Sequence, residues 1–351
     1  MTEKEIKWVM ENVPNINDIS DLVGTDKNGK LIESSNLFLS RCRKHGKELS
    51  LNKEPFSPKQ IKRKQKLIYK LFQLIGPIFL HGMKVKRVNI AELPNNRPII
   101  FAPNHGFTED VMSSFLLGDM HGFPICGSLP LYFNTVDGIA LSIYGSVLIN
   151  RRNKDSRGAL INKVVNVLEN GGNILMFPEG VWNKTANKLT IDFWPGIFWI
   201  AKQSNALIVP EIHLPVEKTI YCSRLPAFDV SVYDDSQVKE ALEDLRTIMN
   251  TELYSLMEKY AHTTREEIIG ECESMTEAGE KFFQERVNSV GKHYDYPMEV
   301  SADYRPKDVI REVDVWKPIA NTQPTKENLL HYLYAKDRVA VLEREDYQHR
   351  I

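Results

Sequence analysis

The segment Asn104-His105-Gly106-Phe107-Thr108-Glu109-Asp110 contains an imidazole and a carboxylate that could act together in proton transfer. A carboxylate that accepts a hydrogen bond from one ring nitrogen fixes the histidine tautomer and leaves the other nitrogen free as a base. The unperturbed histidine pKa, about 6.5, suits a base that works near neutral pH. We therefore expect His105 to be a general base that Asp110 orients.

The spacing of this pair requires a particular local structure. On one continuous helix, side chains five residues apart diverge by about 140°, so His105 must precede the helix that carries Asp110. The short apolar run 99–104 predicts a buried strand, and residues 111–120 predict a helix after a polar turn. This strand–turn–helix order places His105 on the loop and Asp110 in the first helical turn. A His–acid pair at this spacing also arises by composition, as His262 and Glu267 show.

Three further segments place polar residues where predicted strands end. Phe177-Pro178-Glu179-Gly180 forms a sharp turn whose acid is well placed for a ligand in an open α/β sheet. Residues 145–152 end in Arg151 and Arg152, and paired guanidinium groups can bind a phosphate. Ile208-Val209-Pro210-Glu211 ends another apolar run. Each segment, taken singly, also fits an ordinary solvated turn.

Alternating short apolar runs and helical periods continue from about residue 98 to residue 235, which indicates an α/β fold with a mostly parallel sheet. Beyond residue 235 the apolar period is helical. The predicted strands are 99–104, 124–129, 146–151, 173–177 and 206–212, with an edge strand at 228–233. The predicted helices are 111–120, 156–172, 195–204, one from 238 to about 260, one over 264–290 and a short piece near 327–334.

The order and spacing of the four segments resemble the four sequence blocks of the glycerolipid acyltransferase family, the PlsC-like lysophospholipid acyltransferases. The resemblance covers about residues 85 to 235. The His/Asp spacing and the third block are specific, whereas the fourth block is weak. The matched positions are Asn104, His105, Asp110 and a displaced Thr108 in the first block, Gly145, Ile149 and Arg151 in the second, Phe177 to Gly180 in the third, and Ile208, Val209 and Pro210 in the fourth.

The resemblance implies a glycerol-3-phosphate acyltransferase-like sandwich, with a mostly parallel central sheet flanked by helices and with accessory helices. It implies that His105 is the base toward the acceptor hydroxyl, that Asp110 holds it, and that no acyl-enzyme forms. It also implies that Arg151 and the Glu179-Gly180 turn line the site for the polar head of a lysolipid acceptor. The donor would be acyl-CoA or acyl-carrier protein as co-substrate, with no cofactor and no metal.

The chain departs from the family pattern beside the third block. Residues Val181-Trp182-Asn183-Lys184 come after the FPEG turn, where the family often has Thr-Arg-Ser. The missing arginine weakens the prediction of a phosphatidate-like acceptor. Arg152 or Lys184 is our hypothesis for the source of that positive charge.

A basic, amphipathic stretch precedes the predicted core. From Phe56 to Ile90 there are nine Lys and Arg residues and no Asp or Glu, although the whole chain has a net charge of −1. The most apolar part, residues 67–83, is short for a membrane span and contains charged and polar side chains. Gly76-Pro77 should break it into two short helices. We expect this stretch to lie on an anionic membrane surface, and we expect no nucleic-acid partner.

The remaining composition favours a cytoplasmic protein that is peripheral on the membrane surface. The N-terminus lacks the apolar region of a signal peptide, and the four cysteines lack the spacing of a disulfide framework or zinc site. The expected division is an N-terminal region of basic amphipathic helices (1–90), an acyltransferase core (91–235) and a helical C-terminal region (236–351).

Two other functions stay open at this level. The same His/Asp pair in a thioester hydrolase would use water in place of an acceptor alcohol, although the basic lipid-facing stretch argues against this. A non-catalytic lipid-binding scaffold is permitted by the altered residues beside FPEG, although His105 and Asp110 argue against it. A serine hydrolase lacks support because no GxSxG motif occurs.

Overall fold

The computed structural model describes most of the chain between residues 36 and 261 and parts of the C-terminal region. The described residues are Lys4, Lys7, 36–49, 53–127, 129–134, 136–150, 154–183, 188–261, 267, 270, 272–273, 277, 281, 317–326 and 329–348. The chain divides into two compact units, Met1–Tyr304 and Arg305–Ile351. The second unit contains helix α14 (Leu329–Gln348), which is longer than the short helical piece that the sequence predicts.

A seven-stranded sheet forms the centre of the first unit. Its order is β1-β7-β6-β2-β5-β3-β4, and every neighbouring pair is parallel except β6 and β7. This topology confirms the predicted α/β fold with a mostly parallel sheet. The strands are β1 (Lys84–Ile90), β2 (Ile99–Pro103), β3 (Phe123–Cys126), β4 (Val147–Leu148), β5 (Ile174–Leu175), β6 (Leu207–Val216) and β7 (Thr219–Arg224).

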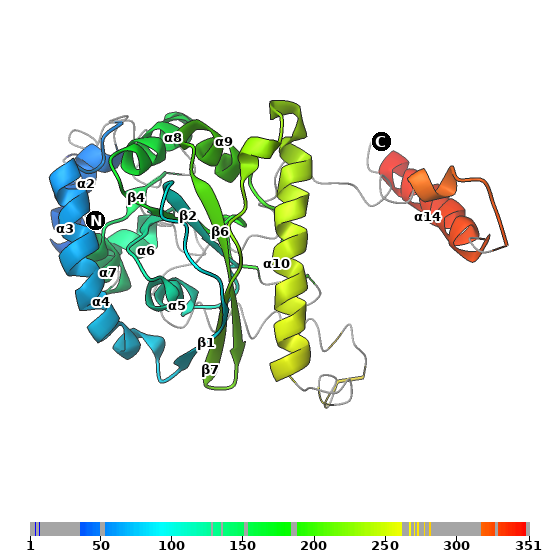
Figure 1. The fold of residues 1–351 in the computed structure, drawn as a ribbon, viewed down its shortest axis with the longest axis horizontal. Helices are drawn as coiled ribbons and strands as arrows, with labels where there is room; N and C mark the ends of the chain where they lie inside the picture. Colours follow the sequence, from blue (N-terminus) through cyan, green and yellow to red (C-terminus); the bar gives the residue numbers. More distant parts are fainter. Residues whose placement is uncertain are drawn as a thin grey trace. The chain divides into compact units, whose positions relative to one another are not determined.

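Helices cover both faces of this sheet (Figure 1). Successive side chains of a strand point to opposite faces, and β2 shows the consequence. Ile100 and Ala102 belong to the core under α8 (Lys154–Glu169), α9 (Gly196–Ser204) and α10 (Val238–Tyr260). Ile99 and Phe101 belong to the opposite core, under α4 (Tyr69–Ile75), α5 (Asp110–Leu117) and α7 (Val136–Tyr144). Both faces of β2 are buried, so its sequence is apolar throughout rather than alternating.

The basic stretch begins as a helix that changes its winding. It consists of α3 (Pro58–Arg63), a π-helical turn at Lys64–Ile68, α4, and a 3-10 turn at Gly76–Leu80. The predicted break at Gly76-Pro77 therefore appears as the change from α to 3-10 winding. Among the described residues, no helix is both long enough and apolar enough to cross a bilayer.

Helix α2 (Asn36–Leu49) packs beside α6 (Leu129–Asn134) and α7, and polar contacts fasten it there. The His45 ring lies between two oxygens: Nδ1 is 2.6 Å from Glu48 Oε2, and Nε2 is 2.7 Å from Ser142 Oγ. Ser142 lies in the last turn of α7, where the helix dipole disfavours a negatively charged oxygen. We therefore interpret this cluster as a structural attachment of α2.

Two edge features differ from the prediction. Residues 228–233 are not a strand: Val230–Val232 form a 3-10 turn, and Phe228 makes only an isolated bridge to Ile208. The Asp229 side chain accepts from the Ser231 N–H, and that local bond starts the turn in place of a sheet ladder. Residues 84–90, which the sequence includes in a helical region, form strand β1. The predicted helix over 264–290 lies outside the described residues, apart from single positions.

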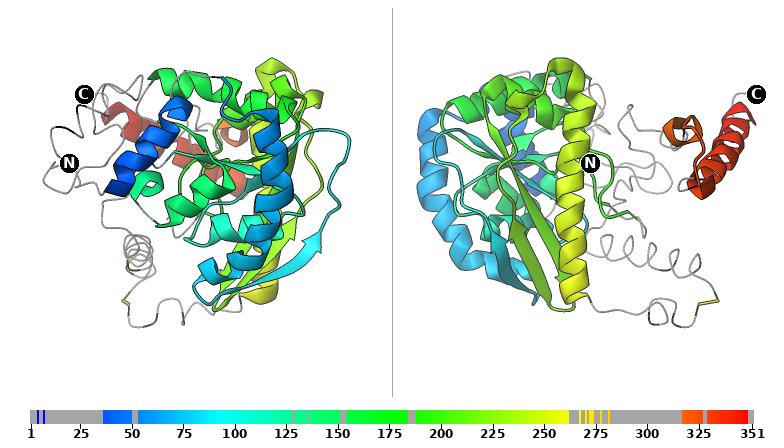
Figure 2. Two further views of the ribbon diagram at one scale, coloured as in Figure 1. Left: turned by 90° about the vertical axis from the view of Figure 1, so that its left-hand side faces the viewer. Right: turned by 45° about the vertical axis from the view of Figure 1, so that its right-hand side comes forward.

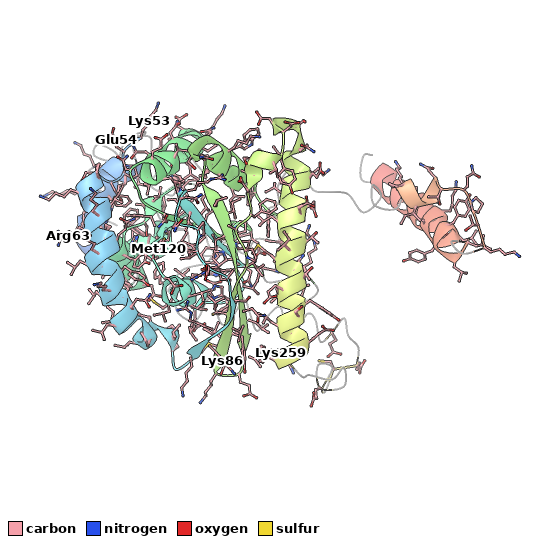
Figure 3. All side chains as sticks on the ribbon, viewed as in Figure 1. Lys53, Glu54, Arg63, Lys86, Met120 and Lys259 are labelled. Carbon is pink, nitrogen blue, oxygen red and sulfur yellow. The ribbon has the colours of Figure 1, made fainter. Side chains whose placement is uncertain are left out.

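The outer strands are joined to α10 through aromatic and cationic side chains. The rings of Tyr221 on β7 and Tyr260 on α10 are stacked with centroids 3.9 Å apart. The ammonium groups of Lys86 on β1 and Lys259 on α10 lie 5.7 and 5.3 Å from the Tyr260 ring (Figure 3). Such contacts between a cation and a ring face are attractive, so they add to the attachment of α10 to this edge of the sheet.

Candidate active site

The loop between β2 and α5 brings the predicted base and its orienter together. His105 Nδ1 is 2.8 Å from Asp110 Oδ2. His105 lies two residues after the last residue of β2, and Asp110 is the first residue of α5. The strand–turn–helix arrangement that the spacing requires is therefore present. Because parallel strands end together, this loop lies at the edge of the sheet where α/β proteins bind ligands.

The Asp110 carboxylate is fixed by backbone donors as well as by the imidazole. Its Oδ2 atom accepts from the N–H groups of Gly106, at 3.0 Å, and Phe107, at 3.3 Å. The side chain is fully buried, at the positive end of the α5 dipole. An oxygen that already accepts two N–H bonds favours a third donor, so Nδ1 of His105 carries the proton. The unprotonated nitrogen is then Nε2.

Aromatic side chains set the plane of the imidazole. The Phe177 ring is stacked on it, with centroids 4.0 Å apart, and the Trp182 ring lies 5.2 Å away. The His105 side chain is 14% exposed, so the ring keeps some access to solvent. Within the described part of the chain, no hydrogen bond reaches Nε2. That atom is therefore available to an incoming group.

Both backbone groups of His105 are also bound. Its N–H donates to Glu179 Oε1 at 2.8 Å, and its carbonyl accepts from the Asn183 N–H at 2.6 Å. The preceding residue, Asn104, makes two bonds with the backbone of His213 on β6, at 2.7 and 3.1 Å. The loop thus has fixed bonds on each side of the imidazole, which limits how far the base can move.

Glu179 is a buried acid between two backbone donors. Its second oxygen, Oε2, accepts from the Ile191 N–H at 2.8 Å, and the residue is 1% exposed. Burial raises the pKa of the Glu179 carboxyl to about 8, against the two hydrogen bonds, which lower it. Since this pKa lies above the ordinary 4.5, the carboxyl's contribution to folding stability is present below about pH 4.5 and is lost as pH rises through about 8.

The turn after Glu179 requires glycine. Gly180 has φ +71°, and a Cβ there would lie 2.7 Å from Cδ1 and Nε1 of the Trp194 indole. Gly180→Ala is therefore expected to lower the free energy of unfolding by about 1–3 kcal/mol. Gly158→Ala is the matched control, because Gly158 lies in helix α8 with no atom near its added Cβ. It should stabilise by about 0.5–1 kcal/mol, and chemical denaturation measures both. Equal changes in the free energy of unfolding for Gly180→Ala and Gly158→Ala would contradict the requirement for glycine at position 180.

The predicted substrate-binding residues divide into two groups. Glu179 contacts the backbone of His105, and Gly180 forms the turn that comes directly after Glu179. Arg151, Arg152 and Lys184 lie outside the described residues, so their part in the site stays a prediction. Strand β4 covers only Val147–Leu148, which is shorter than the strand 146–151 that the sequence predicts.

Several residues of the site were not singled out from the sequence. The backbone N–H of Asn183 donates to the His105 carbonyl, and that of Ile191 donates to Glu179. Nearly every residue has such a donor, so the residue type does not indicate these two contacts. His213 contacts Ser113 Oγ at 2.8 Å through its ring and Asn104 through its backbone. The only sequence signal for His213 is its place three residues after Pro210 on a buried strand.

Comparisons with known proteins show similarity to acyltransferases. The sequence model of the family named Acyltransferase matches residues 84–213, which contain β1 to β5, most of β6 and the His/Asp loop. The chain is 25% identical over 202 residues to the 1-acyl-sn-glycerol-3-phosphate acyltransferases of Salmonella typhimurium and Escherichia coli, covering 54% of this chain and 80% of each relative. The crystal structure of PlsC, the 1-acyl-sn-glycerophosphate acyltransferase of Thermotoga maritima, is similar over 56% of this chain and 82% of that one, with a TM-score of 0.44 and 16% identity.

The family match and the names of these relatives support an O-acyltransferase. The family match over residues 84–213 and the named relatives support the resemblance to PlsC-like acyltransferases. The resemblance that the four sequence blocks indicate is therefore confirmed at the level of family and enzyme class.

Proposed function

We propose that the protein transfers a fatty acyl group from a thioester donor, acyl-CoA or acyl-carrier protein, to the hydroxyl of a lysophospholipid or related glycerolipid. The observation that carries the proposal is the His105 imidazole, whose Nδ1 is bound by Asp110 at 2.8 Å while Nε2 is left for the acceptor. The names of the relatives, 1-acyl-sn-glycerol-3-phosphate acyltransferases, support a glycerolipid acceptor.

In this reaction Nε2 of His105 removes the proton of the acceptor hydroxyl as the oxygen attacks the thioester carbonyl. A C–O bond forms, and the carbonyl oxygen becomes an oxyanion. When the oxyanion collapses, the C–S bond breaks and the thiolate leaves. The imidazolium then returns its proton to the sulfur. Asp110 stabilises the imidazolium throughout, because its buried carboxylate lies against Nδ1.

The acceptor's polar head would bind beside this loop. Arg151, Arg152 and Lys184 are the cations that we propose for a phosphate group, because the altered residues after FPEG remove the arginine that is frequent there.

Incubating the purified protein with labelled acyl-CoA and a panel of lysophospholipids tests the function. Labelled phospholipid is the expected product. Free acid alone would indicate a thioester hydrolase, and no product with retained vesicle binding would indicate a scaffold.

A surface on the N-terminal helix supports binding to an anionic membrane, the location that we propose for this protein in the cytoplasm. Four apolar side chains of α4 and its flanking turns are exposed, and we call them the apolar stripe: Leu67, Leu71, Leu74 and Ile78. Exposed Lys66 and Lys70 lie among them. Apolar residues beside cations are typical of a helix that lies in the membrane interface. Leu80, in contrast, is buried in the core.

Co-sedimentation with vesicles that contain anionic lipid measures this binding. The wild type should bind at low salt and dissociate as salt rises. The double change Leu74→Glu and Ile78→Glu should weaken binding at least about tenfold, since it removes two apolar contacts and adds two negative charges. Val232→Glu is the control. Val232 is 76% exposed, which is close to the exposure of Leu74 (79%) and Ile78 (77%), but it lies in the turn Val230–Val232, outside the apolar stripe. No wild-type binding at low salt would contradict the membrane proposal.

The proposed division of the chain keeps the predicted regions: 1–90 as the lipid-facing region, 91–235 as the acyltransferase core and 236–351 as the helical C-terminal region. In the structure, strand β1 of the first region is part of the central sheet. Helix α10 of the third region packs in the hydrophobic core.

A further inference from the structure

The buried carboxyl group of Glu179 connects two segments that have no regular secondary structure. Its Oε1 atom accepts from the N–H of His105, and its Oε2 atom accepts from the N–H of Ile191, each at 2.8 Å. Both oxygens of this carboxyl group accept from the backbone, and the residue is only 1% exposed, so little of it is accessible to a substrate. Its contacts instead fix the distance between the catalytic loop and the segment 188–192.

The segment 188–192 is in turn attached to helix α10. Thr190 Oγ1 donates to Asn250 Oδ1 at 2.7 Å, and Asp192 Oδ1 is 3.1 Å from Arg246 Nη1. Both Arg246 and Asn250 lie on α10, which runs along the sheet (Figure 2). Ile191 stands between the two attached residues. Its N–H therefore has a position set by α10.

Helix α10 itself is fixed by the core. Leu245 and Met249, which lie next to Arg246 and Asn250 in sequence, are fully buried in the cluster that includes β2 and β6. Helix α10 is therefore a rigid support for the segment 188–192, which has no regular secondary structure of its own. The contacts thus run from the core through α10, Ile191 and Glu179 to the backbone of His105.

We propose that Glu179 is a positioning residue through which helix α10 fixes the catalytic loop, and that it holds His105 rather than the acceptor. This inference rests on the proposed function of His105 as the base. It gives α10, which lies beyond the residues of the family match, a part in catalysis. A displacement of about 1 Å at a reacting group can lower a rate about 10²-fold, so a remote support of this kind affects turnover.

The test compares kcat with the acceptor KM, using labelled acyl-CoA and the lysophospholipid that the wild type acylates best. E179Q keeps the size of the side chain but replaces one accepting oxygen with an NH₂ group, which cannot accept from a backbone N–H. We expect kcat to fall about 10- to 10²-fold, with the acceptor KM changed less than about twofold. The double variant R246Q/N250A should lower kcat in the same direction, again without raising KM.

Asp244→Asn is the matched control on α10, because the Asp244 carboxylate contacts Tyr233 and not the segment 188–192. It should leave kcat within about twofold of the wild type. A raised acceptor KM with unchanged kcat in E179Q would overturn the proposal and return Glu179 to the acceptor site. Unchanged kinetics in E179Q and in the double variant would overturn it as well.

Hydrogen exchange of the wild type supplies a test that needs neither a variant nor activity. The amides of His105 and Ile191 should exchange as slowly as those of the core strands, because each donates to the buried carboxyl group of Glu179. Fast exchange at either amide overturns the proposal even if E179Q does not fold. An inactive wild type with slow exchange would instead count against the proposed function, so the two failures are distinguishable.

Discussion

Replacing Asp110 by Asn is expected to lower kcat for acyl transfer by about 10²- to 10⁴-fold while the protein stays folded. An amide oxygen can still accept from the N–H groups of Gly106 and Phe107, so the loop should keep its shape. The negative charge beside Nδ1 of His105 is lost, however. Because that charge is fully buried, it stabilises the imidazolium far more than an exposed carboxylate would.

Steady-state kinetics together with circular dichroism separate this effect from unfolding. Glu109→Gln is the neighbouring control, since the Glu109 carboxylate pairs with His81 at 2.8 Å rather than with His105. It should change kcat by less than about threefold. An Asp110→Asn protein within tenfold of the wild type would show that the carboxylate charge has little part in catalysis.

Leu245→Ala should lower the free energy of unfolding by about 2–5 kcal/mol, the largest stability change expected of the substitutions proposed for this protein. Leu245 is fully buried in the core that α10 shares with α8, α9 and the sheet. Truncation removes apolar contacts and leaves a cavity that close-packed neighbours fill only in part. The size of this loss measures how much the packing of α10 against the sheet contributes to the stability of the fold.

Ile248→Ala provides the comparison on the same helix. Ile248 is 41% exposed, so its truncation should cost less than about 1 kcal/mol. Urea denaturation monitored by circular dichroism gives both values. A loss below about 1 kcal/mol for Leu245→Ala would indicate that α10 packs loosely. Helix α10 could then not be the rigid element that the proposal for Glu179 requires.

The placement of the His/Asp pair was predictable because it depends on local geometry. A five-residue spacing is incompatible with one helix, and the apolar run before His105 could only be a strand end. The helix period after residue 235 likewise predicted α10, because Leu245, Met249 and Leu253 repeat on one face, and all three are buried.

The sheet edges were less predictable. Strand β7 (Thr219–Arg224) comes after the two-residue turn Glu217-Lys218, in which Glu217 adopts φ +51°, a conformation that its residue type does not signal. Residues 228–233 look like a strand by composition. Their backbone instead forms a 3-10 turn because the Asp229 side chain bonds locally and also receives two bonds from Arg97. Neither edge could therefore be read from its apolar pattern alone.

The contacts around Glu179 could not be predicted, although the residue itself was singled out. Its partners are backbone N–H groups at residue 105 and residue 191, which lie 74 and 12 positions away in the chain. Backbone donors are present at nearly every residue, so no pattern of residue types identifies these two. The prediction that Glu179 contacts the acceptor comes from family resemblance. The positioning role comes from the fold.

The most direct test of His105 as the base of an acyltransferase is the formation of labelled phospholipid by the wild type and by His105→Ala under identical conditions. We expect the wild type to convert labelled acyl-CoA and a lysophospholipid into the acylated lipid. We expect the folded His105→Ala protein to form it about 10²- to 10⁴-fold more slowly, because an alanine side chain cannot accept the proton of the acceptor hydroxyl. Acylated lipid formed at a comparable rate by the variant would contradict the account.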